Sequence, residues 1–323
     1  MENFWNKLSQ QKKPFFCSAP MADVTDTAFR QILAKYGKPD VIFTEMVACD
    51  GLCSVGREKL LKILKFSEIE RPIVAQLFGS KPENFYQSAQ LVKELGFDGV
   101  DINMGCPQKN ILKQGAGSDL INHSDLAREI IRETKRGAGG LPVSVKTRIG
   151  FNKNELDIWL PALLAEKPSA ITIHGRTKKE MSKVKADWNV IKKGVEMAKG
   201  TGVLIIGNGD VQDISDGQQK GKESGVDGVM IGRAILGKPW LLHLDVGRPN
   251  PDEKEKLNIL LEHLDLFEEL YKNEEKGWDK NFSLMKKHMK AYLLGFRGAK
   301  ELRIKLMDCE SKEEAEKLIK ERL

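Results

Sequence analysis

Short apolar segments alternate with segments of helical spacing over the first 231 residues of the chain. Eight segments have the length and the β-branched content of buried strands, at residues 15–19, 41–45, 73–77, 99–103, 143–147, 170–174, 203–207 and 228–231. Between most of them, apolar positions recur every three or four residues, as at 84–95, 125–135 and 156–165. This alternation predicts parallel strands joined by helices. Eight such units fit an α/β fold of the (β/α)8 type, the TIM barrel, which takes about 250 residues.

A doubly wound sheet is the rival arrangement for this alternation. That fold carries Gly-x-Gly-x-x-Gly after its first strand, and here the turn reads Ala19-Pro20-Met21-Ala22-Asp23. The barrel is therefore the preferred interpretation. Several of its helices are expected to end at glycine before the next strand, at Gly37, Gly96, Gly137 and Gly202.

The pattern changes after residue 231. A short helix-like piece at 234–242 leads to a polar link, Gly247-Arg248-Pro249-Asn250-Pro251, which is the expected domain boundary. Beyond it the spacing is helical around 257–267, 282–293 and 311–323. The last helix has Ser311 as its expected N-cap and Glu314 at capping-box spacing. We expect a barrel domain over residues 1–246 and a small all-helical C-terminal domain over 252–323.

Composition narrows the class of protein. Of the 323 residues, 41% are hydrophobic and 30% are charged, and no apolar run approaches the roughly 18 residues that span a bilayer. An integral membrane protein is therefore excluded. The first residues lack the apolar segment of a secretory signal, and five cysteines in so long a chain do not form a disulfide framework. We expect a cytoplasmic protein. Cys49 and Cys53 lack a second Cys or His pair at finger-like spacing, so no structural metal is expected.

Positive charge gathers near the C-terminus. The net charge is +6. Residues 280–307, here called the basic block, hold one acid, Glu301, and eight bases: Lys280, Lys286, Lys287, Lys290, Arg297, Lys300, Arg303 and Lys305. The segments on either side, 252–279 and 308–323, are acidic. A charge run of this kind is either a solvated helix face or a surface for a polyanion.

Polar residues follow the predicted strands. In a barrel enzyme the working residues lie at the carboxyl ends of the strands. Here those ends carry Pro20 and Met21, Glu45, Gln76, Asn103 and Cys106, Lys146 and Arg148, His174, Asn208 and Asp210, and Gly232 and Arg233. A purely structural barrel does not need such a series, so we take these residues as the candidate site.

Two glycine turns predict a phosphate site. Gly207-Asn208-Gly209-Asp210 follows the seventh strand, and Gly232-Arg233 follows the eighth. The loops after these strands are the usual phosphate site of a barrel, because backbone N–H groups approach an anion closely at glycine. Lys146 suits the electron-rich end of a flavin ring, where a fixed cation stabilises the reduced form; otherwise it is an ordinary lysine of the barrel mouth. His174 is a candidate ligand of the same cofactor.

The segment Asn103-Met104-Gly105-Cys106-Pro107 is the most specific motif. Gly and Pro predict a tight loop just past the fourth strand, which holds Cys106 at the barrel mouth. A thiol has a reference pKa of about 8.5, so near neutrality it is protonated and is able to act as a general acid. A small buried hydrophobic residue is the alternative role for a free cysteine.

These segments together resemble the tRNA-dihydrouridine synthase family over residues 14–318. Lys287-His288 and Leu302-Arg303 are similar to the helical domain of that family. In the barrel, the motifs that carry the resemblance are Ala19-Pro20-Met21-Ala22, Thr44-Glu45-Met46, Ala75-Gln76-Leu77-Phe78-Gly79, Asp101-Ile102-Asn103-Met104-Gly105-Cys106-Pro107, Gly115-Ala116-Gly117-Ser118, Lys146-Thr147-Arg148, Ile173-His174-Gly175-Arg176-Thr177, Ala186-Asp187-Trp188, Gly207-Asn208-Gly209-Asp210 and Gly232-Arg233-Ala234. Their order and spacing, more than any single motif, make the resemblance specific.

The resemblance implies an FMN-dependent oxidoreductase that uses NADPH to reduce a uridine of tRNA to 5,6-dihydrouridine. Hydride would pass from the reduced flavin to carbon 6 of the uracil, and Cys106 would donate the proton to carbon 5. The cofactor-binding residues it implies are Pro20, Met21, Ala22, Gln76, Lys146, His174, Asn208, Gly209, Asp210, Gly232 and Arg233. The substrate-binding residues it implies are Asn103 and Arg148 at the mouth, and Lys286, Lys287 and Arg303 in the basic block.

The partner that the resemblance implies is tRNA, with no membrane and no obligate protein partner. The target base has to swing out of its stack to reach the flavin, and the basic block would contact tRNA phosphates. Between Arg176 and Ala186 the chain has Glu180 and Val184, where many members of the family carry Gln and Gly. That difference bears on substrate preference more than on the chemistry.

Two alternatives stay open at this point. An FMN-dependent reductase of free pyrimidines, of the dihydroorotate dehydrogenase type, shares the barrel and a similar Cys-Pro turn, but it lacks a basic helical tail. A catalytically silent RNA-binding module would be expected to lose Cys106 or Lys146, and both are present.

Overall fold

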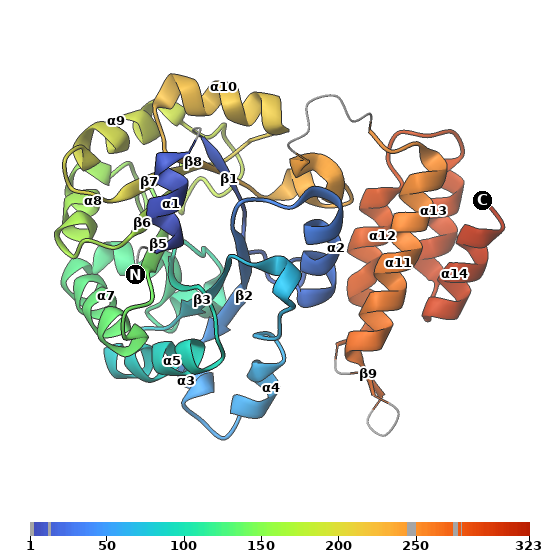
Figure 1. Cartoon of the computed structure of the whole chain (residues 1–323), viewed down its shortest axis with the longest axis horizontal. Helices are drawn as coiled ribbons and strands as arrows, with labels where there is room; N and C mark the ends of the chain where they lie inside the picture. Colours follow the sequence, from blue (N-terminus) through green and yellow to red (C-terminus); the bar gives the residue numbers. More distant parts are fainter. Residues whose placement is uncertain (1–2, 12–13, 244–249, 274–276, 279) are drawn as a thin grey trace.

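Eight parallel strands form one curled sheet in the computed structural model, which describes residues 3–11, 14–243, 250–273, 277–278 and 280–323. The sheet order is β1-β8-β7-β6-β5-β4-β3-β2. Next to β1, the Ser18 N–H donates to the Val41 carbonyl at 3.1 Å, so the two edges of the sheet meet and the barrel closes (Figure 1). The strands are β1 (Phe15–Ser18), β2 (Ile42–Ala48), β3 (Ile73–Phe78), β4 (Gly99–Met104), β5 (Val143–Arg148), β6 (Ala170–His174), β7 (Leu204–Asn208) and β8 (Gly228–Ile231).

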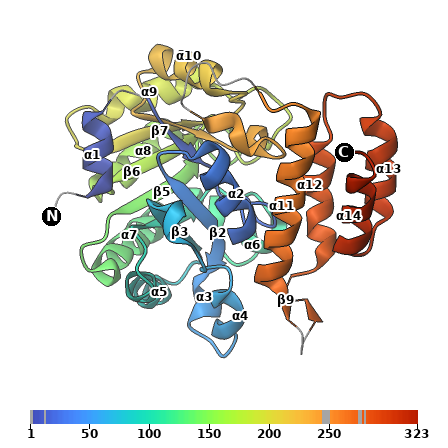
Figure 2. The same cartoon turned by 45° about the vertical axis from the view of Figure 1, so that its right-hand side comes forward.

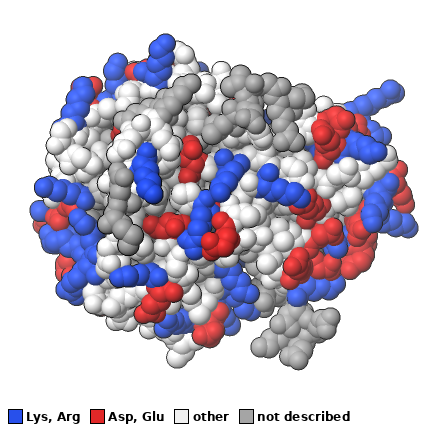
Figure 3. Space-filling model, in the orientation of Figure 1, with Lys and Arg blue, Asp and Glu red and all other residues white. Residues whose placement is uncertain are grey.

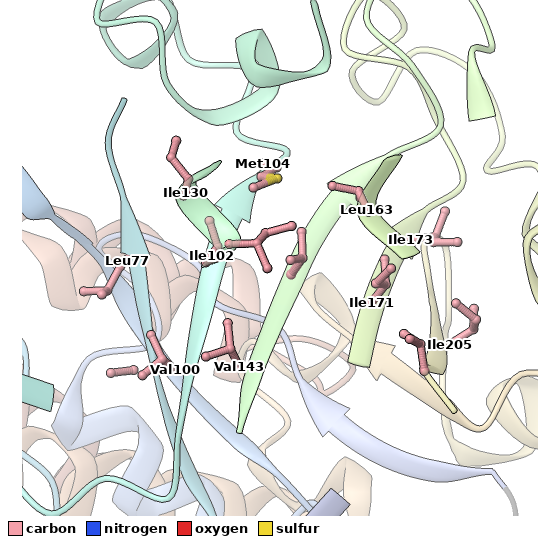
Figure 4. Packing of buried hydrophobic residues seen from close by; sticks show 14 of the residues in the cluster. Leu77, Val100, Ile102, Met104, Ile130, Val143, Leu163, Ile171, Ile173 and Ile205 are labelled. Atoms are coloured by element: carbon pink, nitrogen blue, oxygen red, sulfur yellow. The ribbon is translucent and has the colours of Figure 1, made fainter. Parts of the chain in front are cut away.

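Helices cover the outside of the sheet. The main ones are α2 (Thr27–Gly37), α5 (Pro82–Glu94), α7 (Ser124–Ala138), α8 (Leu156–Ala165), α9 (Trp188–Ala198) and α10 (Ile214–Ser224). Shorter helices are α1 (Phe4–Gln10), α3 (Cys49–Leu52), α4 (Arg57–Leu61) and α6 (Lys109–Leu112). The largest buried cluster lies between strands and helices, where Ile102 and Val143 of the sheet pack with Ile130 of α7 and Leu163 of α8 (Figure 4).

Alternation along the strands decides what fills the barrel. Successive side chains of a strand point to opposite faces, so residues two apart share a face. An apolar cluster that includes Phe43, Val74, Ile206 and Met230 occupies the interior, and Trp5 of α1 packs against it. The next inward position toward the carboxyl end of β3 is Gln76, two residues after Val74. The same step on the other strands places polar side chains at the mouth.

The C-terminal helices form a tail that packs against α2 (Figures 1 and 2). The tail consists of α11 (Glu253–Tyr271), α12 (Met285–Tyr292), α13 (Ala299–Asp308) and α14 (Lys312–Lys320), with a small hairpin of β9 (Lys272–Asn273) and β10 (Gly277–Trp278). Its buried cluster includes Ala28 and Ile32 of α2 and Trp240 of the barrel. The tail therefore shares its core with the barrel. Residues 247–249 of the expected link lie outside the described residues, and the division into domains stays a prediction.

Most expected elements are confirmed within a few residues, but several details differ. Gly202 was expected to end a helix and does not, because α9 already ends at Ala198 with Lys199 as its C-cap. Gly137 was expected to end a helix, which is wrong: it lies inside α7, where a Cβ would come 2.1 Å from the Tyr86 carbonyl oxygen of α5, and Gly139 ends the helix with φ +52°. Helix α13 was not expected. The expected piece at 234–242 consists of two 3-10 turns, Arg233–Ile235 and Pro239–Leu242.

The cap of the last helix is half as expected. The Ser311 hydroxyl accepts from the Glu314 N–H at 3.3 Å, which confirms the N-cap. The Glu314 carboxylate turns instead to the Glu310 N–H, at 2.9 Å. The helix itself ends at Lys320.

Candidate active site

A cleft of about 1020 Å³ opens at the carboxyl ends of the strands. Ten residues that the sequence singled out line it: Pro20, Met21, Lys146, Arg148, His174, Asn208, Gly209, Asp210, Gly232 and Arg233. Ala22, Gln76, Asn103 and Cys106 are not among the lining residues, although Gly105, next to Cys106, is. The structure thus gathers most of the strand ends around one opening, with the Cys106 loop beside it.

Lys146 joins two strands across the cleft. Its amine donates to Oδ1 of Asn208 at 3.2 Å, and Nδ2 of Asn208 donates to the Met230 carbonyl at 2.8 Å. Burial, with the neighbouring Arg148 charge, lowers the pKa of Lys146 to about 8. The amine is thus a cation at neutral pH, but a poorly solvated one, which favours an anionic partner.

Arg148 fixes the tautomer of His174. Nη1 of Arg148 lies 3.1 Å from Nδ1 of His174 and 3.2 Å from the Thr177 carbonyl oxygen. A guanidinium only donates, so Nδ1 accepts and the ring proton is on Nε2. Burial, helped by the surrounding cations, lowers the pKa of His174 well below its ordinary value, so the ring is neutral. His174 is therefore a neutral N–H donor beside the Gly209 turn.

The turns after β7 and β8 are organised by one carboxylate. Oδ1 of Asp210 lies 3.1 Å from Nη2 of Arg233, and Oδ2 accepts from Arg176 and from the Ala186 N–H. Asp210 thus orients two guanidinium groups, and the side chain of Arg233 stays 70% exposed. Gly209 has φ +124°, and a Cβ there would come 2.6 Å from the Ala186 Cβ, so this turn requires glycine.

A chain of side-chain amides runs from β4 to the Cys106 loop. Buried Asp101 accepts from the Ser144 hydroxyl at 2.6 Å and from Nε2 of Gln76 at 2.7 Å. Because an ionised carboxylate only accepts, Gln76 turns its oxygen toward Asn103, whose Nδ2 donates to it at 2.9 Å. Oδ1 of Asn103 is then left to accept from the N–H groups of Gly105 and Cys106. Both ends of the Asn103 amide are engaged within the protein, so its contact with a substrate stays a prediction.

Cys106 is a half-buried thiol on a firmly held loop. Its carbonyl accepts from both the N–H and the hydroxyl of Ser118, each at 3.0 Å. A Cβ at Gly117 would come 2.8 Å from the same carbonyl, which leaves room there only for glycine. Burial raises the pKa of the Cys106 thiol, against the opposing effect of Arg148 and Lys146. The group is therefore a protonated thiol at neutral pH, the form in which it is able to donate a proton.

The three substrate candidates of the tail lie apart from the cleft lining. The amine of Lys286 donates to the Met307 carbonyl at the end of α13, at 2.7 Å. Lys287 projects from α12 toward the barrel, and its Nζ lies 3.8 Å from Oδ2 of Asp23. Arg303 is half-buried in the middle of α13. Figure 3 shows that cations and carboxylates are mixed on this face of the molecule, with several acidic side chains over the tail.

Several residues of the site were not assigned a role from the sequence. Lys185, Trp188 and Lys220 line the cleft, and Trp188 donates from its indole to the Gly209 carbonyl at 2.9 Å. Asp101 was recognisable, because it lies two residues before Asn103 and so shares its face of β4. Lys220 lies within α10 and gives no comparable signal.

In the described part of the chain, no group of three or more His, Cys, Asp and Glu side chains is placed to hold a metal ion. Within the same residues, no helix is long and apolar enough to cross a membrane.

The sequence matches the family model described as dihydrouridine synthase over residues 17–323. A probable tRNA-dihydrouridine synthase of Staphylococcus aureus (strain COL) is 41% identical over 324 residues, covering 99% of this chain and 95% of that protein. A probable tRNA-dihydrouridine synthase 2 of Bacillus subtilis (strain 168) is 42% identical, covering 98% of this chain and 96% of that protein.

Solved structures agree on the fold. Morphinone reductase in complex with tetrahydroNAD superposes with a TM-score of 0.51 at 12% identity, covering 79% of this chain and 94% of that one. A 2-naphthoyl-CoA reductase complex gives a TM-score of 0.57 at 11% identity, covering 74% of this chain and 52% of that one. At such low identity these likenesses show the barrel and nothing finer.

Proposed function

The chain belongs to the dihydrouridine synthase family, and we propose that it reduces a uridine of tRNA to 5,6-dihydrouridine with flavin mononucleotide as cofactor and NADPH as reductant. It is a flavin-dependent oxidoreductase that acts on tRNA. The observation that carries the residue assignments is the position of Cys106: a protonated thiol stands beside a cleft whose lining cations suit an anionic cofactor.

The cleft fits a flavin nucleotide by its volume and its charges. Its volume of about 1020 Å³ lies at the upper end of ordinary cofactor pockets, which run to about 1,000 Å³. On the side of the β7 and β8 turns, Arg233 and Lys220 suit a phosphate, and the glycine at 209 leaves the backbone accessible. Next to this turn, at the ends of β5 and β6, Lys146 and the Nε2–H of His174 suit the polar edge of the ring. The lining therefore offers one place for a phosphate and one for a ring.

The chemistry of the reaction divides between cofactor and protein. Bound flavin supplies the hydride. Cys106 holds the proton that carbon 5 of the uracil receives, and its raised pKa keeps that proton on the sulfur at neutral pH. Asn103 orients the loop, and Arg148 braces it from the other side by donating to the Gly105 carbonyl at 2.7 Å. The protein thus contributes position and one acid.

The substrate is tRNA, which bears on both alternatives left open by the sequence. Relatives named tRNA-dihydrouridine synthases match nearly the full length of the chain, tail included, which favours tRNA over a free pyrimidine. The presence of Cys106 and Lys146 at one mouth supports a catalyst rather than a silent RNA-binding module. The target base is expected to be flipped out of its stack into the cleft.

The test addresses the identity of the cofactor and of the reductant. Purified protein is examined for a flavin absorbance spectrum, the released cofactor is identified by chromatography, and NADPH and NADH are compared as reductants under anaerobic conditions. We expect FMN and faster reduction by NADPH. A protein without flavin bands after incubation with FMN would rule out the proposed cofactor, and equal rates with the two nucleotides would overturn the choice of NADPH.

A further inference from the structure

The loop that joins β1 to α2, residues 19–26, connects the cleft to the tail. Its first half lines the cleft through Ala19, Pro20 and Met21. Its second half forms a closed turn, in which the Met21 carbonyl accepts from the N–H groups of Val24 and Thr25, at 3.1 and 2.9 Å. We call this segment the first loop. Any shift of its second half reaches Met21 directly through these bonds.

The turn needs an outside support. Asp23 has φ +58°, the left-handed region that a residue other than glycine enters at a cost. Its N–H is held by Oε1 of Glu45, in the middle of β2, at 2.6 Å. Glu45 is buried, with 5% of its surface exposed. Its carboxylate therefore fixes the strained point of the first loop.

A lysine of the tail neutralises that carboxylate. Nζ of Lys280 lies 2.7 Å from Oε2 of Glu45 and 3.5 Å from Oδ2 of Asp26, which caps α2. The side chain of Lys280 is only 16% exposed and lies over the Tyr271 ring, 5.2 Å from its centroid. Without this amine, two buried carboxylates would face each other unpaired. Removing one partner of a buried ion pair is strongly destabilising.

Three more contacts from the tail reach the same segment. The His288 ring hydrogen-bonds the Val24 backbone, and the Tyr271 hydroxyl accepts from the Thr27 N–H at 3.2 Å. Lys287 adds an exposed and therefore weak ion pair with Asp23. The tail thus holds the end of the first loop and the start of α2 at several neighbouring positions.

We propose that Lys280 is a positioning residue of the flavin site: through Glu45 it fixes the first loop, so that the helical tail supports this wall of the cleft from outside. This inference rests on the proposed flavin cofactor. Lys280 is then a member of the basic block that faces the barrel and not RNA, because its amine is engaged by two carboxylates of the barrel.

A matched control exists in the tail itself. Lys312 is equally buried, at 15% exposure, and its amine also lies between two carboxylates, Asp265 and Glu268, at 2.5 and 2.9 Å. Both of these belong to α11, so Lys312 does not reach the barrel through them. The partner carboxylates are more exposed than those of Lys280, at 60% for Asp265 and 20% for Glu268. Lys312→Met therefore reports the effect of removing a buried lysine from an ion pair within the tail, while the support of the first loop stays in place.

The experiment compares full-length wild type, Lys280→Met and Lys312→Met. Flavin affinity is titrated, the visible circular dichroism of the bound flavin is recorded, and hydrogen exchange of residues 20–26 is followed by mass spectrometry in flavin-free protein. For Lys280→Met we expect flavin affinity weaker by about tenfold, about 1.4 kcal/mol, an altered dichroism and faster exchange in the first loop. For Lys312→Met we expect all three to stay at the wild-type values.

A rescue variant keeps the proposal falsifiable if Lys280→Met folds poorly. Glu45→Gln retains an oxygen for the Asp23 N–H and removes a charge, so Glu45→Gln with Lys280→Met should bind flavin better than Lys280→Met alone. Unchanged exchange in Lys280→Met, equal losses in Lys312→Met, or absence of rescue would overturn the proposal. Exchange is measured without flavin, so a wild type that binds no flavin would count against the proposed function alone.

Discussion

The side-chain oxygen of Asn103 accepts a hydrogen bond from the backbone N–H of Cys106 at 2.9 Å. The orientation of the Asn103 amide is set by Asp101. Asp101 accepts a hydrogen bond from Gln76, and the Gln76 oxygen in turn accepts from the Asn103 amide nitrogen. The orientation of the proposed acid is thus set by a buried carboxylate on the same strand. We call this hydrogen-bond chain from Asp101 through Gln76 to Asn103 the amide relay. It leads to two predictions that distinguish the reaction with RNA from the reaction with the nicotinamide.

Asn103→Ala removes the acceptor for two backbone N–H groups of the Cys106 loop. We expect uridine reduction to slow by about 10²-fold, the cost of a misplacement near 1 Å, while reduction of the bound flavin by NADPH continues at the wild-type rate. Rapid-mixing measurements of each half-reaction check this. Asn122→Ala, which removes only an exposed hydrogen bond to Asp119, is the control. If both half-reactions slowed together in Asn103→Ala, the loop would not be its target.

Asp101 predicts a pH dependence of the RNA half-reaction. Burial raises the pKa of Asp101 to about 6. Above that pH the carboxylate accepts from Gln76; below it the carboxyl group is able to donate, which reverses the amide relay and withdraws the acceptor from Cys106. We expect the rate of uridine reduction to fall as the pH drops through about 6. Asp101→Asn cannot titrate, so its profile should lack this limb, and a limb of unchanged position in the variant would contradict the assignment.

Two buried histidines predict loss of stability in acid. His263 of α11 and His288 of α12 meet edge to face at 4.6 Å, and burial lowers the pKa of His288 to about 4 and that of His263 well below its ordinary value. In the unfolded chain both titrate near pH 6.5. Below that pH each histidine is protonated in the unfolded state but stays neutral in the folded state. The free energy of unfolding therefore falls by about 1.4 kcal/mol for each histidine with every unit by which the pH is lowered.

The substitution His263→Phe removes the contribution of one histidine to this pH dependence. Neither ring nitrogen of His263 has a hydrogen-bond partner among the described residues, and its neighbours include the aromatic rings of Phe29 and Tyr292. The variant should reduce the dependence of unfolding free energy on pH between 6 and 4.5 by about 1.4 kcal/mol per unit. Denaturant titrations at several pH values measure it. An unchanged slope would show that His263 does not titrate on unfolding.

The basic block predicts a salt signature for tRNA binding. Lys290 is exposed on α12 and Arg303 is half-buried on α13. Reversing the charge at either should weaken tRNA binding and flatten the plot of log K against log salt by roughly 0.7–0.9 for each phosphate that the variant no longer neutralises. Lys286→Met should instead lower stability, because the amine of Lys286 holds the Met307 carbonyl. Equal salt slopes in wild type, Lys290→Glu and Arg303→Glu would show that the block is a solvated face.

The sequence predicts the barrel and the mouth residues for one physical reason. Alternation with a period of two places Gln76, Asn103, Lys146 and His174 on the inner face at the carboxyl ends of their strands, whichever helices follow. The same rule reaches Asp101 once Asn103 is recognised. Local spacing is enough because each of these positions is fixed by its own strand.

Contacts between distant segments are what the sequence does not predict. Lys280 and Lys286 belong to one charge run, yet one faces two carboxylates of the barrel and the other a helix end in the tail. The core that the tail shares with the barrel also depends on contacts between distant segments. Removing residues 252–323 would expose Ala28, Ile32 and Trp240. We therefore expect the isolated barrel to be poorly stable.

The central claim is tested most directly by mapping modified nucleosides in tRNA. Unmodified tRNA is incubated with NADPH and either wild-type protein or Cys106→Ala, and dihydrouridine is located by mass spectrometry as a uridine that has gained two hydrogens. We predict that the wild type forms dihydrouridine at defined positions. With Cys106→Ala we predict formation slower by about 10²–10⁴-fold, while NADPH still reduces the flavin of the variant. Undiminished formation by Cys106→Ala, or none by a flavin-loaded wild type, would contradict the account.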